Sequence, residues 1–253
     1  MSISTELQLG VLTITLDRAS ARNALTVDMF RTLAETLAQA ADDGAVRVVR
    51  LKGGETVFSA GADLTESQTH PEEMAAATEE CFASLRAFPK PVVAAVCGPA
   101  VGEAFTMLLY CDLVYADDKA LFSVPAVALA RTPRFGTCAL MASAAGAPAA
   151  TEKLLLGLPI SAAEAQAMRL ICAAVPSEDL EQRAAAAVAR LAVLPPQALI
   201  ATKRQLVEAR DRIVLPALLS DEAIYRRQCA TEEAQEALSA FLEGRKPVFH
   251  RDN

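Results

Sequence analysis

The chain has 253 residues, with 24 Lys and Arg against 31 Asp and Glu, which gives a formal net charge of −7 at pH 7 and argues against general nucleic-acid binding. Hydrophobic residues make up 53% of the chain and charged residues 22%, enough apolar material for a large core and too much for a disordered protein. Trp is absent and Phe and Tyr are few, so we expect an α-rich or α/β protein.

The first half of the chain alternates strand patterns with helix patterns. Apolar and Thr residues alternate over 11–16, which predicts a half-buried strand. Thr26 is the expected N-cap of a helix that continues to about Gly44, and a second strand is expected over 46–51. Pro71 then opens another helix.

The second half begins with the same alternation and ends almost wholly helical. A continuous apolar run over 92–96 predicts a strand that is covered on both faces, and shorter strands are expected over 113–116 and 120–122. Repeated strand, helix, strand order predicts a mainly parallel sheet flanked by helices. Ser161 and Glu164 have the spacing of a capping box at the start of one of the later helices.

We therefore divide the chain into an α/β core, 1–195, and a helical C-terminal region, 196–253. The apolar faces of the helical region have no separate core to pack on, so we expect them to meet another subunit.

Six cysteines without a CxxC pair, and two histidines far apart in the sequence, predict neither a disulfide framework nor a metal site. The first residues do not have the pattern of a signal peptide, and no uncharged stretch is long enough to span a bilayer comfortably. We expect a cytoplasmic protein with reduced cysteines and no membrane partner.

Two stretches of small residues offer backbone N–H groups to a ligand. The GxSxG, GxxxxGK, GxGxxG and HExxH motifs are absent. The stretch 59–63 allows close approach to the main chain, and Gly102-Glu103 lies where a helix begins and exposes unpaired N–H groups. Together these groups can form an oxyanion hole, or the first stretch is only a tight turn and the second only a strand exit.

Six motifs resemble the crotonase (enoyl-CoA hydratase/isomerase) superfamily and occur in its order along nearly the whole chain. They are 22–25 (RNAL), 58–64 (FSAGADL), 90–96 (KPVVAAV), 98–102 (GPAVG), 111–116 (CDLVYA) and 241–247 (FLEGRKP). The resemblance implies a crotonase-like spiral of ββα units, with C-terminal helices that form a homotrimer or a dimer of trimers. It also implies a coenzyme A thioester as substrate or ligand, and no tightly bound cofactor.

The resemblance also implies roles for individual residues. The backbone N–H groups of Ala60 and Glu103 would hold the thioester oxygen and stabilise the negative charge that develops on it during reaction. Coenzyme A would lie along the early motifs, with basic side chains as phosphate partners. The residues implied in coenzyme A binding are Arg22, Ala24, Ala60, Ala62, Asp63, Leu64, Lys90 and Lys246.

The sequence departs from the family at the positions that usually carry the catalytic carboxylates. The two hydratase positions hold Thr106 and Ala126, and the isomerase position holds Arg134. None of these side chains exchanges protons near pH 7. Two interpretations stay open for each of two side chains. Glu103 is either a substitute base or only a favourable charge at a helix start. Arg134 either binds an acyl anion or is structurally paired.

Two functions follow from this reading. The first is an acyl-CoA-processing enzyme, an isomerase or lyase of this family, that works through a thioester enolate. The second is a non-catalytic homologue that binds acyl-CoA.

Overall fold

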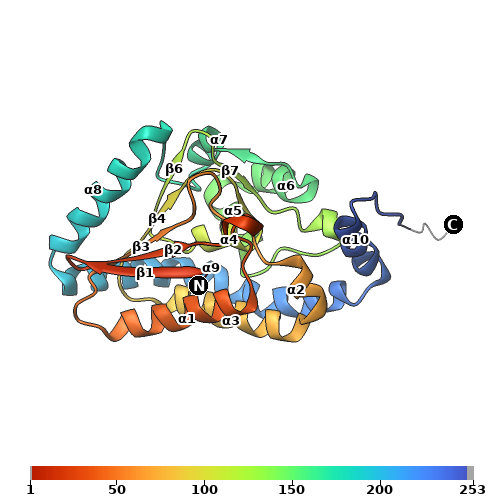
Figure 1. Cartoon of the computed structure of the whole chain (residues 1–253), viewed down its shortest axis with the longest axis horizontal. Helices are drawn as coiled ribbons and strands as arrows, with labels where there is room; N and C mark the ends of the chain where they lie inside the picture. Colours follow the sequence, from red (N-terminus) through yellow and green to blue (C-terminus); the bar gives the residue numbers. More distant parts are fainter. Residues whose placement is uncertain (1, 250–253) are drawn as a thin grey trace.

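A six-stranded sheet runs through the middle of the molecule (Figure 1). The computed structural model describes residues 2–249. The strand order is β1-β2-β3-β4-β6-β9, and every pair is parallel except β1 with β2. The strands are β1 (Ile3–Gln8), β2 (Val11–Leu16), β3 (Val48–Lys52), β4 (Val92–Val96), β6 (Leu113–Asp117) and β9 (Ala173–Val175).

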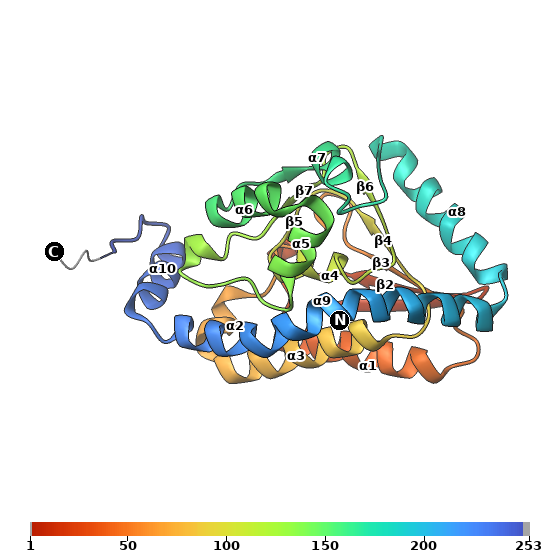
Figure 2. The same ribbon diagram turned by 180° about the vertical axis from the view of Figure 1, so that it is seen from behind.

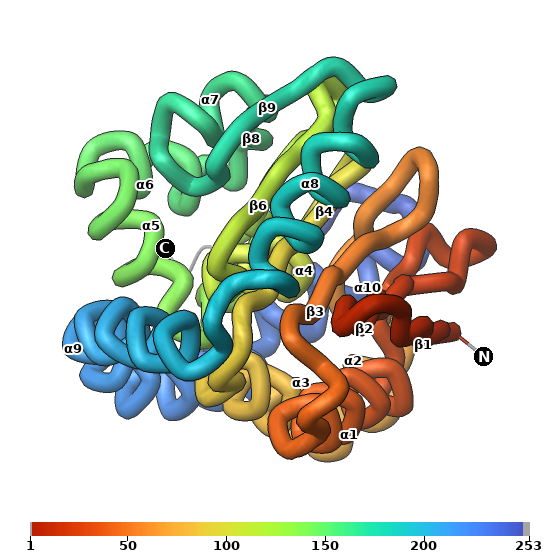
Figure 3. Tube along the Cα trace, turned by 90° about the vertical axis from the view of Figure 1, so that its left-hand side faces the viewer, coloured from red at the N-terminus to blue at the C-terminus, as the bar shows by residue number. Residues whose placement is uncertain are grey.

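Helices cover both faces of this sheet because its central strands are apolar on both sides. In β4, Val92, Ala94 and Val96 join the main core, while Val93 and Ala95 face the opposite way. Helices α1 (Val27–Asp42) and α3 (Pro71–Ala87) pack together on the core side, and α8 (Leu180–Val193) lies across the strands on the other side (Figure 3).

A smaller sheet, in the order β5-β7-β8, lies beside the main one and leads into the candidate site. Helix α4 starts at Glu103, directly after strand β5, which ends at Val101. The strands of this sheet are β5 (Ala100–Val101), β7 (Leu121–Ser123) and β8 (Ile160–Ser161). The short helices around the two sheets are η1 (Ala19–Ala21), α2 (Leu64–Thr69), α4 (Glu103–Leu108), η2 (Val127–Leu129), α5 (Thr137–Ala145), α6 (Ala147–Leu156), α7 (Ala162–Ala167) and η3 (Ser177–Asp179).

The C-terminal region consists of α9 (Pro196–Cys229) and α10 (Glu232–Glu243). Figure 2 shows α9 running along most of the molecule towards α10 at one end. Ion pairs hold α9 to the core, among them Lys203 with Asp112 at 2.7 Å and Arg86 with Asp211 at 2.8 Å. Helix α9 begins at Pro196, and both the division of the chain at 195/196 and oligomerisation through this region stay predictions.

The predicted α/β architecture and most predicted elements are confirmed. The strands over 11–16 and 92–96 have the predicted bounds. Thr26 caps α1 by accepting the Met29 N–H at 3.2 Å, and Ser161 and Glu164 form a capping box. Strand β1 was not predicted, because five of its six residues are exposed and its sequence does not alternate in polarity.

Three further findings apply to residues 2–249 alone. The six cysteines, all within this range, are free. No group of three or more His, Cys, Asp or Glu side chains is arranged to hold a metal ion. No single helix is long and apolar enough to cross a membrane.

Candidate active site

Two chain segments that leave neighbouring strands run side by side at the candidate site. Ser59 and Ala100 form a parallel β-bridge, and the Val101 N–H donates to the Ser59 carbonyl at 3.0 Å. Ala62 and Glu103 each lie three residues beyond this bridge, so their backbones come to the same place. The register of the bridge therefore brings the two predicted stretches of small residues together.

Gly61 allows this close approach. Its φ is +88°, and a Cβ built on it would lie 2.6 Å from the Val101 carbonyl oxygen. Only glycine adopts this left-handed conformation and also leaves room for the neighbouring backbone.

The N–H groups of this loop differ in what they already bind. The Ala60 N–H donates to the Arg22 carbonyl at 3.0 Å, so the prediction that it binds a thioester oxygen is wrong. The Ala62 N–H instead meets the Glu103 carboxylate, at a long 3.4 Å. The Glu103 N–H, at the first position of α4, has no acceptor among residues 2–249. The Glu103 N–H is therefore unpaired among residues 2–249 and the Ala62 N–H is only weakly bonded, so these are the two donors that a ligand can engage.

The Glu103 side chain folds back over these donors. It is the only Asp or Glu side chain of residues 2–249 that lines the adjacent cavity. Across that cavity, burial raises the pKa of the Tyr225 phenol; the charge of Arg131 opposes this shift and the charge of Glu103 adds to it. The phenol therefore stays protonated as the pH rises.

The cavity has a volume of about 410 Å³ and extends from the oxyanion-hole segments to α9 and α10. Leu64, Met74, Leu129, Phe135 and Phe241 contribute apolar walls. The side chains at the three positions of the missing family carboxylates line it as well: Thr106, Ala126 and Arg134. The sequence thus identified positions that the fold gathers at one cavity.

Neither hydratase position supplies a group for proton transfer. The Thr106 hydroxyl lies 2.8 Å from the Thr137 hydroxyl, which donates its own proton to the Arg134 carbonyl at 2.6 Å. Thr106 must therefore be the donor to Thr137, and its single proton is used inside the protein. Ala126 has no polar atom.

Arg134 is structurally paired. Its guanidinium donates to Glu222 at 2.6 Å, lies 3.4 Å from Glu79, and has the rings of Phe135 and Tyr225 each 4.4 Å away. The side chain is only 5% exposed. Of the two alternatives for Arg134, structural pairing is confirmed, and the acyl-anion role is wrong because the carboxylates of its own chain already occupy the guanidinium.

Lys90 cannot hold a coenzyme A phosphate. Its ammonium is buried and donates to the carbonyls of Ala40 and Asp43, at 2.6 and 2.7 Å, where α1 ends. Burial lowers the pKa of Lys90, and the nearby Asp43 charge opposes that shift. Lys90 also precedes β4, whereas the site lies beyond the other end of that strand, so the prediction for Lys90 is wrong.

Arg22 and Lys246 remain predictions as phosphate partners. Both side chains are exposed, and neither forms an ion pair within residues 2–249. Lys246 lies between Arg245 and Pro247, which both line the cavity. The other residues implied in coenzyme A binding also stay predictions: Ala24, Ala60, Ala62, Asp63 and Leu64.

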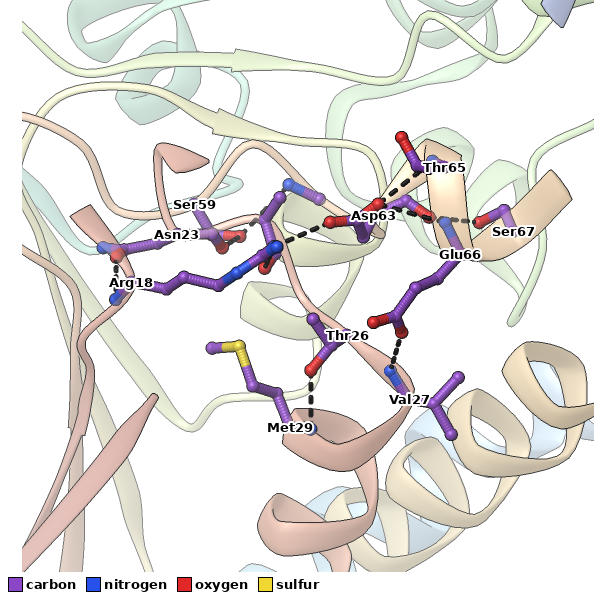
Figure 4. A network of polar contacts seen from close by, with 12 residues as sticks. Arg18, Asn23, Thr26, Val27, Met29, Ser59, Asp63, Thr65, Glu66 and Ser67 are labelled. Atoms are coloured by element: carbon purple, nitrogen blue, oxygen red, sulfur yellow. Dashed lines mark hydrogen bonds and ion pairs between the residues drawn. The ribbon is translucent and has the colours of Figure 1, made fainter. Parts of the chain in front are cut away.

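Asp63 stabilises the loop that carries Ala62 (Figure 4). Its carboxylate accepts from Arg18 at 2.7 Å and caps α2 through the N–H groups of Thr65 and Glu66. Burial alone would raise the pKa of Asp63, but these hydrogen bonds and the Arg18 charge lower it overall. Asp63 is thus a hydrogen-bond acceptor that stabilises this loop.

Comparisons with known proteins identify the family and the fold. A family model described as enoyl-CoA hydratase/isomerase matches residues 6–252. The 2,3-dehydroadipyl-CoA hydratase of Escherichia coli (strain K12) is 34% identical over 247 residues, which cover 96% of each chain. An enoyl-CoA hydratase/isomerase from Pseudoalteromonas atlantica T6c superposes with a TM-score of 0.91 at 28% identity, covering 99% of this chain and 100% of that chain. An enoyl-CoA hydratase from Mycobacterium avium subsp. paratuberculosis K-10 superposes with the same TM-score at 31% identity, covering 99% of both chains.

Proposed function

This chain belongs to the enoyl-CoA hydratase/isomerase family, and on that premise we propose that it moves a proton on an acyl-CoA thioester through an enolate held in an oxyanion hole. The two donors of the hole are the N–H groups of Ala62 and Glu103, and the base is the Glu103 carboxylate. The observation that carries this proposal is the meeting of the Ala62 N–H with the Glu103 carboxylate, two groups on separate segments in fixed register.

The oxyanion hole acts on the charge that develops during reaction. When the proton on the carbon next to the thioester leaves, negative charge collects on the thioester oxygen. Preformed N–H donors at that position stabilise this charge by about 3 kcal/mol each. Because a backbone N–H supplies the hydrogen bond, Glu103 serves as a donor as well as any other non-proline residue.

Glu103 then has two roles, one after the other. The incoming thioester oxygen replaces the Glu103 carboxylate at the Ala62 N–H, and the weak 3.4 Å contact makes this exchange easy. The displaced carboxylate stays next to the reacting carbon as a base. A single carboxylate can take a proton from one carbon and return it to another, which favours isomerisation.

Hydration fits the site less well. Adding water across a double bond needs one group to activate the water and another to protonate carbon, and Thr106 and Ala126 supply neither. We therefore place the reaction in the class of proton transfer between carbons.

The remaining family features are part of the same proposal. Arg22 and Lys246 are the basic side chains that we assign to the coenzyme A phosphates. We assign the exposed apolar side chains of α9 to the subunit interfaces of a homotrimer or a dimer of trimers. Leu206 and Leu219, for example, are 65% and 86% exposed. Light scattering that gives the mass of a single chain would contradict this assembly.

Exchange of the α-protons of butanoyl-CoA in D2O tests the proposed chemistry, because it reports enolate formation without requiring the natural reaction. We expect the protein to catalyse the exchange, followed by NMR, and Glu103→Gln to lower its rate by about a hundredfold or more. Glu103→Gln keeps the backbone N–H and removes only the ionisable group. Glu35→Gln, an exposed change on α1, is the control and should exchange at the normal rate.

Each result has a definite meaning. Equal exchange by Glu103→Gln and the unchanged protein would refute Glu103 as the base. Tight binding of butanoyl-CoA without any exchange would refute the enolate chemistry and leave the non-catalytic acyl-CoA-binding alternative.

A further inference from the structure

Three arginines line the cavity, and they differ in their partners. Arg134 is paired with Glu222, and Arg245 is paired with Glu236 at 2.7 Å. Arg131 forms no ion pair and no side-chain hydrogen bond within residues 2–249. Its Nε is fully buried and has no acceptor. Arg131 is thus the one arginine of the cavity wall whose charge this part of the chain leaves unbalanced.

The next residue has an unused polar group as well. The Thr132 hydroxyl is buried without a partner among residues 2–249, and Thr132 lines the same cavity. The backbone fixes both residues, because the Arg131 N–H donates to the Ala126 carbonyl at 2.9 Å and Pro133 follows directly. Buried donors without partners are uncommon in folded proteins, and a ligand is one source of the missing acceptor.

The cavity therefore carries two opposite charges that form no ion pair with each other among residues 2–249. The single carboxylate that residues 2–249 contribute, on Glu103, lies against Ala62 at the oxyanion hole. The Arg131 cation, which is unpaired among residues 2–249, lowers the pKa of the Tyr225 phenol, whereas the Glu103 carboxylate raises it. An anionic group on a ligand is repelled near Glu103 and attracted at Arg131.

We infer that the acyl group which this cavity accepts carries a carboxylate at the end remote from its thioester, and that Arg131 and Thr132 bind this carboxylate. The guanidinium matches a carboxylate because it offers parallel N–H donors, and the Thr132 hydroxyl adds a third. The apolar side chains that also line the cavity suit the methylene chain of such a dicarboxylic acyl group. The inference rests on the proposed function for its ligand, a coenzyme A thioester.

Calorimetric binding of paired saturated acyl-CoA esters tests the inference, since α-proton exchange leaves these esters chemically unchanged and no net reaction consumes them. The pairs have acyl chains of four, five and six carbons, with and without a terminal carboxylate. We expect the unchanged protein to bind the carboxylated member of at least one pair about tenfold more tightly or better. Arg131→Met should abolish that preference and leave the affinity for the uncharged ester within about twofold.

Arg227→Met is the matched control, because it removes an exposed arginine of α9 that does not line the cavity. It should retain the preference. If thermal melting shows that Arg131→Met does not fold, Thr132→Val answers the question instead, with an expected reduction of the preference of about threefold.

The outcomes separate the inference from the proposed function. Equal affinities within all three pairs, or a preference that persists in Arg131→Met, would overturn the inference and leave the thioester site standing. Failure of every ester to bind would overturn both.

Discussion

Replacing Gly61 by alanine tests whether the close approach of the two segments creates the site. The new Cβ would lie 2.6 Å from the Val101 carbonyl oxygen. The backbone of residue 61 fixes the Cβ and the oxygen is itself a backbone atom, so neither can rotate away. Ordinary contact begins at 3.4 Å, so the loop must move away from Val101 by about 0.8 Å. Ala62 is the next residue and moves with the loop.

The expected effects follow from this displacement. The left-handed φ of +88° costs an alanine about 1–2 kcal/mol, and the steric overlap adds about 1–3 kcal/mol. A misplacement on the scale of 1 Å lowers catalytic rates by about a hundredfold. We therefore expect Gly61→Ala to lower the free energy of unfolding by about 2–5 kcal/mol and the rate of α-proton exchange by one to two orders of magnitude, about ten- to a hundredfold.

Urea unfolding and α-proton exchange measure the two effects, and Gly146→Ala is the matched control. Gly146 has a φ of +83°, but a Cβ on it would meet nothing within 4 Å. Its ψ of 152° lies in a region that is nearly exclusive to glycine, so Gly146→Ala should lower the free energy of unfolding by about 1–3 kcal/mol and keep the normal exchange rate. If Gly61→Ala matched this control in both measurements, the argument that close packing positions the Ala62 N–H would be wrong.

Three further predictions concern residues whose roles the structure decides. Arg134→Met should lower the free energy of unfolding in urea by about 3 kcal/mol. Arg226→Met, which removes the exposed partner of the same Glu222, should lower it by less than about 1 kcal/mol, and equal losses would contradict the buried pairing. Lys90→Met should lower stability by about 1–3 kcal/mol without changing acyl-CoA affinity in calorimetry, and weaker binding would restore Lys90 as a phosphate partner. Because the pKa of Asp63 is lower in the folded protein, its ionised carboxylate stabilises the fold above its unfolded-state pKa of about 4, and this contribution is lost as the pH falls. Asp63→Asn should therefore reduce the loss of stability measured from about pH 5 to about pH 2. An unchanged profile would count against the ion pair with Arg18.

The local elements were predictable because they depend on neighbours in the sequence. Helix α1 follows from the apolar spacing after Thr26 and from the capping hydroxyl, which acts three residues away. Strand β4 follows from five consecutive apolar residues, all of them buried. Strand β1 was missed because its stability comes from pairing with β2 and not from an apolar pattern of its own.

The candidate site was predictable as a region but not in its individual groups. The family motifs indicated both segments of the oxyanion hole and the positions of Thr106, Ala126 and Arg134, which line one cavity. They did not distinguish Ala60 from Ala62, because the two alanines flank the same glycine.

The sequence by itself determined the α/β class, most helices and strands, and the family, since these depend on local periodicity and on ordered motifs. Only the tertiary structure decided which groups are free to bind a ligand. The Ala60 N–H is taken by Arg22 and the guanidinium of Arg134 by Glu222, both far away in the sequence, while Arg131 is left without a counter-charge among residues 2–249. Hydrogen bonds and ion pairs of this kind form between segments that meet only after the chain has folded, so local sequence cannot specify them.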